Sequence, residues 1–229
     1  MNKIRILVTN DDGIYAPGIK ALWGAMSELG DVTVVAPNRE RSAVGHAITI
    51  SDPLRVDEVR RSNGFKGFSV DGTPSDCVKI ATQALLEEKP DIIVSGINLG
   101  SNTGTNIIYS GTVSAATEGT MLNIPSVAVS LNSFGESDFA GAKTAAKAVV
   151  SHVLEKGLPE KTFLNVNVPA ILEDEIKGYK ITQQGNVAFR DRFEKQPHSQ
   201  DHKQLSTSFE RKKCKKTPPL SLRTQIQNN

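Results

Sequence analysis

The stretch "ILVTNDDGIYAPGI", residues 6–19, decides the fold of this chain. An apolar, β-branched run ends in two adjacent carboxylates, Asp11 and Asp12, and then Gly13. Apolar side chains at helical spacing begin at Ile19, so the stretch predicts a buried strand, a polar turn and a helix. A strand followed by a helix in this way is the first half of a strand–helix–strand unit, which favours a parallel sheet.

The same alternation continues through most of the chain. Five short apolar runs are typical of strands buried on both faces: residues 4–9, 32–37, 91–96, 126–131 and 163–168. Between them, apolar residues recur at helical spacing in 19–29 and 142–153. A further helix is predicted to begin at Thr73 or Pro74 and to stop at Pro90.

Residues 52–71 lack this rhythm and are predicted to form a hairpin-like excursion. Together with the strands and helices, this predicts an α/β fold of the Rossmann-like, three-layer kind. Its sheet should be doubly wound and mostly parallel, with helices on both faces.

Composition excludes several classes of protein. The chain has 229 residues with 27 Lys and Arg against 25 Asp and Glu, and a net charge of +2 gives no general attraction to nucleic acid or membranes. Its two cysteines, Cys77 and Cys214, are too few for a disulfide framework, which suits a reducing compartment. The first residues do not resemble a signal peptide, and no run approaches the roughly 20 apolar residues of a membrane span. We therefore expect a cytoplasmic protein that binds neither nucleic acid nor membrane.

The C-terminal part differs from the rest. Residues 196–229 carry seven basic and two acidic side chains, a charge of +5, so residues 1–195 carry −3. From about Arg190 the apolar residues are scattered without a steady period, which is typical of segments that bury no core. The prediction is one α/β domain over residues 1–195, and over 196–229 a basic tail that is disordered or aberrant, for example the product of a shifted reading frame.

Oxygen-bearing side chains follow several of the predicted strands. In open α/β sheets ligands bind beyond the carboxyl ends of the strands. Asp11 and Asp12 follow the first strand, Ser42 follows the second, and Asn98 lies at the end of the run that begins at residue 91. Two adjacent carboxylates stay ionised most easily beside a cation, so the doublet indicates a metal site. A solvated capping turn is the alternative that the doublet alone leaves open.

A second cluster of polar residues indicates an anion site. Asn102 lies in a Gly-rich loop, and Ser110, Gly111 and Thr112 immediately precede a helix of small residues. The unpaired N–H groups and the dipole at a helix N-terminus favour phosphate. An ordinary helix cap is the alternative, and the convergence of both clusters at one sheet edge favours a site. His46 lies near it and could assist proton transfer, although a loop histidine is more often surface.

Five motifs in this order resemble the SurE family of metal-dependent 5′/3′-nucleotidases over residues 1–195. They are "ILVTNDDGIYAPGI", "VVAPNRERSAVGHAIT", "VDGTPSDCV", "KPDIIVSGINLGSNTGTNIIYSGTVSAATEG" and "LNVNVP". The resemblance implies a divalent cation bound by Asp11, Asp12, Ser42 and Asn98. It also implies a phosphate held near Asn102 and by Ser110, Gly111 and Thr112. Four oxygen ligands suit Mg²⁺ or Mn²⁺ better than Zn²⁺.

The function implied by the resemblance is hydrolysis of nucleoside 5′-monophosphates, with 3′-monophosphates as a possible extension, to nucleoside and phosphate. One of Asp11 and Asp12 would orient or deprotonate the attacking water. The family forms homo-oligomers, dimers or tetramers, through an extended C-terminal hairpin, but no aromatic-rich strand is recognisable after Lys195.

Two other functions compete with this one. A haloacid-dehalogenase-like phosphatase would need an Asp-x-Asp spacing, whereas Asp11 and Asp12 are adjacent. A nucleotide-binding module without catalysis is the second alternative.

Overall fold

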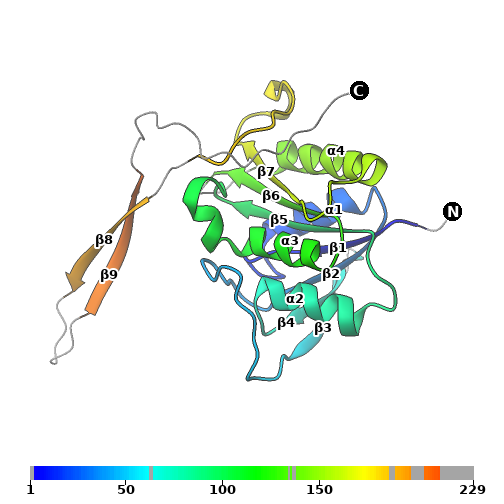
Figure 1. Cartoon of the computed structure of the whole chain (residues 1–229), viewed down its shortest axis with the longest axis horizontal. Helices are drawn as coiled ribbons and strands as arrows, with labels where there is room; N and C mark the ends of the chain where they lie inside the picture. Colours follow the sequence, from blue (N-terminus) through cyan, green and yellow to red (C-terminus); the bar gives the residue numbers. More distant parts are fainter. Residues whose placement is uncertain are drawn as a thin grey trace. The chain divides into compact units, whose positions relative to one another are not determined.

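The computed structural model of this chain describes residues 3–61, 64–133, 135 and 138–185, together with the backbone of 189–196 and 204–211. The chain divides into two compact units, one of residues 1–102 and 108–178 and the other of residues 103–107 and 179–229. The first unit contains the large sheet and the four α-helices of the described residues (Figure 1).

The first unit is built on a seven-stranded sheet with the strand order β3-β4-β2-β1-β5-β6-β7. Every neighbouring pair is parallel except β3 and β4. The strands are β1 (Arg5–Thr9), β2 (Asp31–Pro37), β3 (Val56–Arg60), β4 (Lys66–Val70), β5 (Ile92–Leu99), β6 (Ser126–Asn132) and β7 (Leu164–Pro169). The sheet grows outward in both directions from β1, which confirms the predicted doubly wound, mostly parallel fold.

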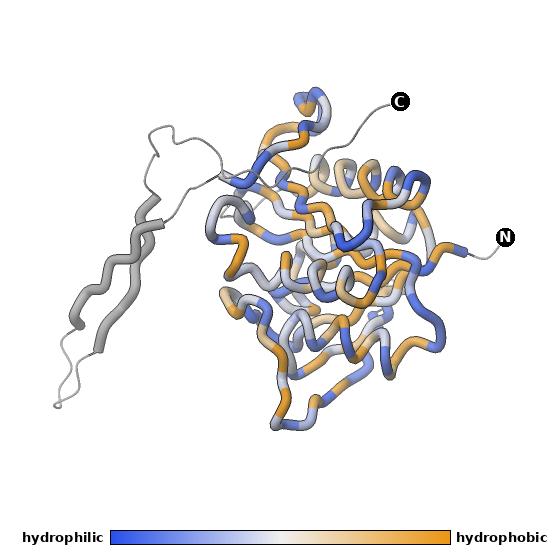
Figure 2. Tube along the Cα trace, in the orientation of Figure 1, coloured by the Kyte–Doolittle hydropathy of each residue, from blue (hydrophilic) through white to orange (hydrophobic). Residues whose placement is uncertain are grey.

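The helices cover both faces of the sheet (Figure 1). They are α1 (Pro17–Met26), α2 (Pro74–Ile80), α3 (Gly111–Met121) and α4 (Ala140–Lys156). Ile19 of α1 and Val150 of α4 pack in one apolar core with Val8 and Val94, and Cys77 of α2 packs in a second core with Leu7. Figure 2 shows the apolar residues concentrated along these strands. Strands buried on both faces explain the near-continuous apolar runs of the sequence.

The predicted excursion at residues 52–71 is the hairpin of β3 and β4. Its second strand also pairs in parallel with β2, so the hairpin extends the main sheet. The helix that begins at Pro74 is capped by Thr73, as predicted, but it ends before Pro90. It closes with a π-helical turn, Ala81–Leu85, after which Leu86 is extended. Arg5 then pairs with both Glu88 and Asp91, in the segment with bends that leads into β5.

Two short 3-10 helices, Gly104–Tyr109 and Glu173–Glu175, also lie in the described residues. Within the part of the chain that the structure describes, no helix has the length and apolar character required to cross a bilayer.

The second unit contains an antiparallel pair, β8 (Phe189–Gln196) and β9 (Gln204–Arg211). The strand β9 corrects the expectation that residues after 196 lack regular structure. Leu205, Thr207 and Phe209 alternate with polar residues there, and this period of two is a strand signal that the charged surroundings obscure. Residues 197–203 and 212–229 of the predicted tail lie outside the described residues, and the domain boundary at residue 195 stays a prediction.

Candidate active site

A tight turn after β1 presents the two aspartates. Asn10 is fully buried, and its side chain donates to Gly13 O (3.1 Å) and accepts from Gly13 N (3.2 Å). Gly13 has a φ of 97°, a conformation that side chains with a Cβ rarely adopt. The Asn10 and Gly13 pair therefore fixes the backbone on both sides of Asp11 and Asp12 at the carboxyl edge of the sheet.

Asp11 is buried against the start of α3. Its side-chain Oδ1 accepts a hydrogen bond from the Thr112 hydroxyl at 2.5 Å. Burial raises the pKa of Asp11, and hydrogen bonds from the Thr112 side chain and from the backbone of Thr112 and Gly111 partly offset that rise. The N-terminus of α3 thus faces a carboxylate, as helix dipoles favour.

Gly111 permits this close approach. A Cβ at Gly111 would lie 2.7 Å from Asp11 Cβ, closer than real Cβ atoms approach, and 3.0 Å from Pro74 Cγ, a tighter contact than most. The first residue of α3 is therefore in direct contact with both the aspartate turn and the start of α2.

Asp12 is only half-buried, yet the pKa of its carboxyl group is strongly raised. Burial, together with the negative charges of Asp11 and Glu40, raises the pKa of Asp12 to about 7. A carboxylate disfavoured by neighbouring negative charge is stabilised by a cation placed among them. This electrostatic strain supports the prediction that the doublet holds a metal ion.

The segment between β2 and β3, residues 38–55, contains neither helix nor strand, and we call it the Ser42 loop. It reaches the aspartates through the backbone, because Arg41 N donates to Asp11 O at 2.7 Å. The Ser42 hydroxyl is exposed and donates to Glu40 Oε1 at 2.5 Å, which leaves its lone pairs available. The loop thus places a hydroxyl oxygen and an additional carboxylate near Asp12.

Asn98 lies where β5 departs from regular pairing. The register of β5 against β6 shifts between Ser95 and Asn98, as in a β-bulge, and such irregularities are frequent beside active sites. The Asn98 amide nitrogen donates to Gly100 O at 2.6 Å. Its carbonyl oxygen is therefore the atom suited to ligate a cation.

Asn102 is buried and anchored by the neighbouring strands. Its backbone N–H donates to Asn167 Oδ1 (2.8 Å), its backbone carbonyl accepts from Asn165 Nδ2 (2.9 Å), and its side chain donates to Ser130 Oγ (2.8 Å). The motif "LNVNVP" thus supplies two asparagines that fix the loop after β5. The sequence offered no signal for this, because the partners are more than 60 residues apart.

Ser110 caps α3 as an N-cap residue, accepting from Val113 N at 3.1 Å. Part of the predicted phosphate cradle is therefore already used: Ser110 Oγ binds its own helix, and Thr112 binds Asp11. Among the described residues, no hydrogen bond joins Asn98 or Asn102 to the aspartates. The structure brings together Asp11, Asp12, the Ser42 loop and the start of α3, and places both asparagines at the same sheet edge.

The donor set fits a hard cation. It consists of carboxylate, amide and hydroxyl oxygens, the ligands that Mg²⁺ and Mn²⁺ prefer. Within the described part of the chain, no group of three or more His, Cys, Asp or Glu side chains could hold a metal ion. A site here would accordingly rely on Ser42 and Asn98 in addition to the two aspartates.

His46 lies on the Ser42 loop, and within the described part of the chain it makes no hydrogen bond to the aspartates. Its Nε2 lies 2.7 Å from Oε2 of Glu118, a buried residue of α3 that sequence reasoning missed. Sequence reasoning also missed four other polar residues of this region, because single polar residues in loops and strands show no periodic pattern. They are Glu40, Asp76, Asn165 and Asn167.

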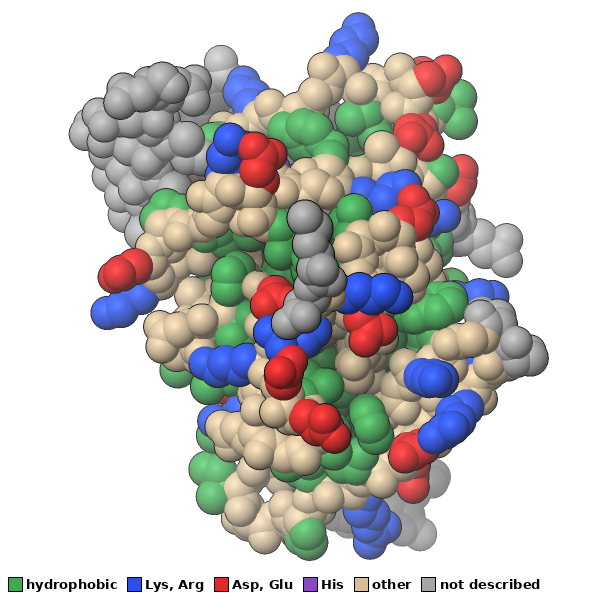
Figure 3. Space-filling model, turned by 90° about the vertical axis from the view of Figure 1, so that its right-hand side faces the viewer, with side chains coloured by type: hydrophobic (Ala, Val, Ile, Leu, Met, Phe, Trp, Pro, Cys, Tyr) green, Lys and Arg blue, Asp and Glu red, His purple; other side chains and the backbone are tan. Residues whose placement is uncertain are grey.

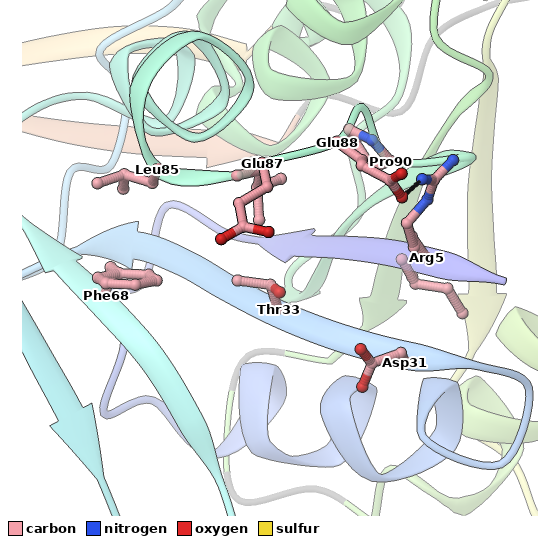
Figure 4. A pocket seen from close by; sticks show the side chains of 10 residues that line it. Arg5, Asp31, Thr33, Phe68, Leu85, Glu87, Glu88 and Pro90 are labelled. Atoms are coloured by element: carbon pink, nitrogen blue, oxygen red, sulfur yellow. Dashed lines mark hydrogen bonds and ion pairs between the residues drawn. The ribbon is translucent and has the colours of Figure 1, made fainter. Parts of the chain in front are cut away.

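A separate hollow of about 350 Å³ lies at the opposite, amino edge of the sheet (Figure 4). Arg5 at the start of β1 and Asp31 at the start of β2 line it, and Arg5 pairs there with Glu88. No predicted site residue belongs to it. Acidic and basic side chains are intermixed on the face shown in Figure 3, and its described residues form no extended patch of one charge.

Known proteins resemble this chain over most of its length. Residues 6–191 match the family described as Survival protein SurE. A protein named 5′-nucleotidase SurE from Syntrophobacter fumaroxidans is 50% identical over 199 residues, which cover 87% of this chain and 80% of the relative. Another of that name from Pelobacter propionicus is 54% identical over 187 residues, 81% of this chain and 74% of the relative.

A solved structure agrees with these sequence matches. The crystal structure of the SurE protein from Aquifex aeolicus superposes with a TM-score of 0.77 at 42% identity, covering 90% of this chain and 83% of the other. The family match spans the aspartate turn, the Ser42 loop and the start of α3. On these grounds the chain belongs to the SurE family.

Proposed function

We propose that this protein is a metal-dependent 5′-nucleotidase, a phosphomonoester hydrolase that converts nucleoside monophosphates to nucleoside and phosphate. The curated relatives carry the name 5′-nucleotidase SurE, which supports the activity. The observation that carries the proposal is the convergence of Asp11, Asp12, the Ser42 loop and the N-terminus of α3 at the carboxyl edge of the sheet.

In this proposal Asp11, Asp12, Ser42 and Asn98 hold Mg²⁺ or Mn²⁺. The bound cation would polarise the phosphoryl oxygen and lower the pKa of a water. Asp11 is fixed by Thr112 and is buried, so it serves as an immobile ligand. Asp12 is more accessible and makes no such contact with Thr112, so it is the better placed of the two to orient the attacking water.

The substrate phosphate would lie between the cation and α3. Ser110, Gly111 and Thr112 bring the positive end of the helix dipole to this point, and Asn102 borders it from the loop after β5. Positive potential at this position offsets the charge that develops on the phosphoryl oxygens in the transition state.

Release of phosphate from nucleoside 5′-monophosphates with added Mn²⁺ tests the activity. Turnover would exclude a nucleotide-binding module without catalysis. A screen of 3′-monophosphates and other phosphomonoesters then defines the substrate range. A covalent aspartyl-phosphate trapped on Asp11 or Asp12 would favour the haloacid-dehalogenase-like chemistry instead.

The proposal extends to assembly and location. We infer a homo-oligomer, a dimer or tetramer, and a cytoplasmic location. Sedimentation of the purified full chain tests the first and cell fractionation tests the second.

A further inference from the structure

The Ser42 loop is long for a segment without regular structure. It runs for residues 38–55 with no helix or strand. Loops of this length in compact domains are usually functional, and they keep one conformation only where side chains and backbone groups anchor them. The loop carries a proposed metal ligand, so its anchors bear directly on the site.

Three acidic side chains are buried in the part of the chain that the structure describes: Asp11, Asp76 and Glu118. Each of these three residues contacts the Ser42 loop. Asp11 O accepts from Arg41 N at 2.7 Å, and the Asp76 carboxylate accepts from Thr49 N and Thr49 Oγ1 at 2.9 and 2.7 Å. Glu118 contacts His46 at 2.7 Å.

The contacts of Asp11 and Asp76 have evident purposes without the loop. Asp11 is a proposed metal ligand, and Asp76 completes the capping box of α2 with Thr73. Glu118 neither caps a helix nor belongs to the proposed metal ligands. It lies in the middle of α3, and its side-chain partners are His46 and, at 3.5 Å, Lys79 of α2.

A buried carboxylate is costly unless it is paired, so Glu118 constrains its partners to stay in place. The residues on either side of His46 are also attached: Gly45 N donates to Tyr109 O at 3.0 Å, and Ala47 O accepts from the Thr73 hydroxyl at the start of α2 at 2.7 Å. Tyr109 directly precedes Ser110, the N-cap of α3. The contacts of His46 and Gly45 therefore tie the middle of the Ser42 loop to α3 and to the residue before its N-cap, and the first turn of this helix contacts Asp11.

We propose that Glu118, acting through His46, is a positioning residue that holds the Ser42 loop against α3 and thereby sets the affinity of the site for its divalent cation. This inference rests on the proposed metal-dependent function. Groups outside the immediate ligand shell that orient it typically contribute 10–100-fold to metal affinity.

The test uses the full-length apoprotein and four variants: His46→Ala, Glu118→Ala, Glu118→Gln and the double alanine variant. Calorimetric titration with Mn²⁺ alone measures affinity, and amide hydrogen exchange over residues 43–50 measures how firmly the loop is held. Glu155→Gln is the matched control, because Glu155 is an exposed carboxylate on α4 that pairs only with its neighbour Lys156 among the described residues.

His46→Ala and Glu118→Ala should each weaken Mn²⁺ binding by about 10-fold and accelerate exchange in residues 43–50. The double variant should be no worse than either single variant, because the two side chains act as one unit. Glu118→Gln should retain most of the affinity, since its amide oxygen still accepts from His46. At saturating Mn²⁺, kcat should stay within about 3-fold of the wild type, since neither residue contacts the reacting groups.

Unchanged Mn²⁺ affinity and unchanged exchange in His46→Ala, a partly exposed position whose replacement spares the core, would overturn the inference. So would additive losses in the double variant. If the wild type binds Mn²⁺ but releases no phosphate, the proposed activity fails while the positioning role is still decided by affinity. If it binds no Mn²⁺, the claim about affinity fails with the metal site, and the exchange data alone report whether Glu118 holds the loop.

Discussion

Thr112 and Asp11, 101 residues apart in sequence, are joined by a 2.5 Å hydrogen bond from the threonine hydroxyl to the buried carboxylate. The contact links the turn after β1 to the first turn of α3. It fixes one oxygen of Asp11, so the carboxylate has a single orientation toward the site. The consequences of this link can be measured.

Replacing Thr112 with Val should weaken both metal binding and catalysis. Valine has the same shape as threonine but cannot donate, so Asp11 loses its orienting hydrogen bond while packing is retained. We expect a loss of about 10-fold in Mn²⁺ affinity. Thr112→Ser keeps the hydroxyl and should lose much less, and equal losses in the two variants would show that the hydrogen bond is not the cause.

Gly111→Ala should displace α3 from the aspartate turn. The added methyl group would meet Asp11 and Pro74 at 2.7 to 3.0 Å, so we expect kcat/KM to fall by about 10-fold or more. Gly24→Ala on α1 is the control, because a Cβ there meets nothing within 4 Å. That control should keep full activity and gain roughly 0.5–1 kcal/mol of stability. Wild-type kinetics in Gly111→Ala would contradict the packing described for the site.

Asp12→Asn should stabilise the metal-free protein at neutral pH. The folded-state pKa of Asp12, about 7, lies above its ordinary value of 3.8, so the folded state binds more protons between these values and loses stability as pH rises. This loss of folding stability is complete above pH 7 and absent below about pH 4. In chelator, the variant should therefore unfold a few degrees higher than the wild type at pH 8, with a smaller difference at pH 5. Equal melting temperatures at pH 8 would show that Asp12 is not electrostatically strained.

Much of the fold follows from the sequence because the determinants are local. The runs at β1, β5 and β6 are largely apolar because those strands are buried on both faces. Thr73 and Ser110 indicate helix starts because their side chains can cap a helix N-terminus. The hairpin at 52–71 is recognisable, but its parallel pairing with β2 depends on tertiary packing. The π-helical turn after α2 ends at Leu85, and Arg5 binds Glu88 just beyond it from 83 residues away, a contact that no local pattern predicts.

The candidate site is less predictable, because several of its contacts join residues that are far apart in sequence. Strand ends identify Asp11, Asp12, Ser42 and Asn98 as neighbours at one edge, since parallel strands align their carboxyl ends. The anchoring of Asn102 by Asn165 and Asn167, and of His46 by Glu118, joins residues that share no periodic pattern. Such contacts follow from packing and are visible only once the fold is known.

The central claim is that the aspartate doublet holds a cation required for phosphoester hydrolysis. The most direct measurement is phosphate release from a nucleoside 5′-monophosphate by the full-length protein, in chelator and after Mg²⁺ or Mn²⁺ is restored, for the wild type and for Asp11→Asn and Asp12→Asn. We predict no turnover in chelator, recovery with metal in the wild type, and rates lower by on the order of 10²-fold or more in each variant while the fold persists. Full activity in excess chelator, or wild-type kcat and metal affinity in either variant, would contradict the account.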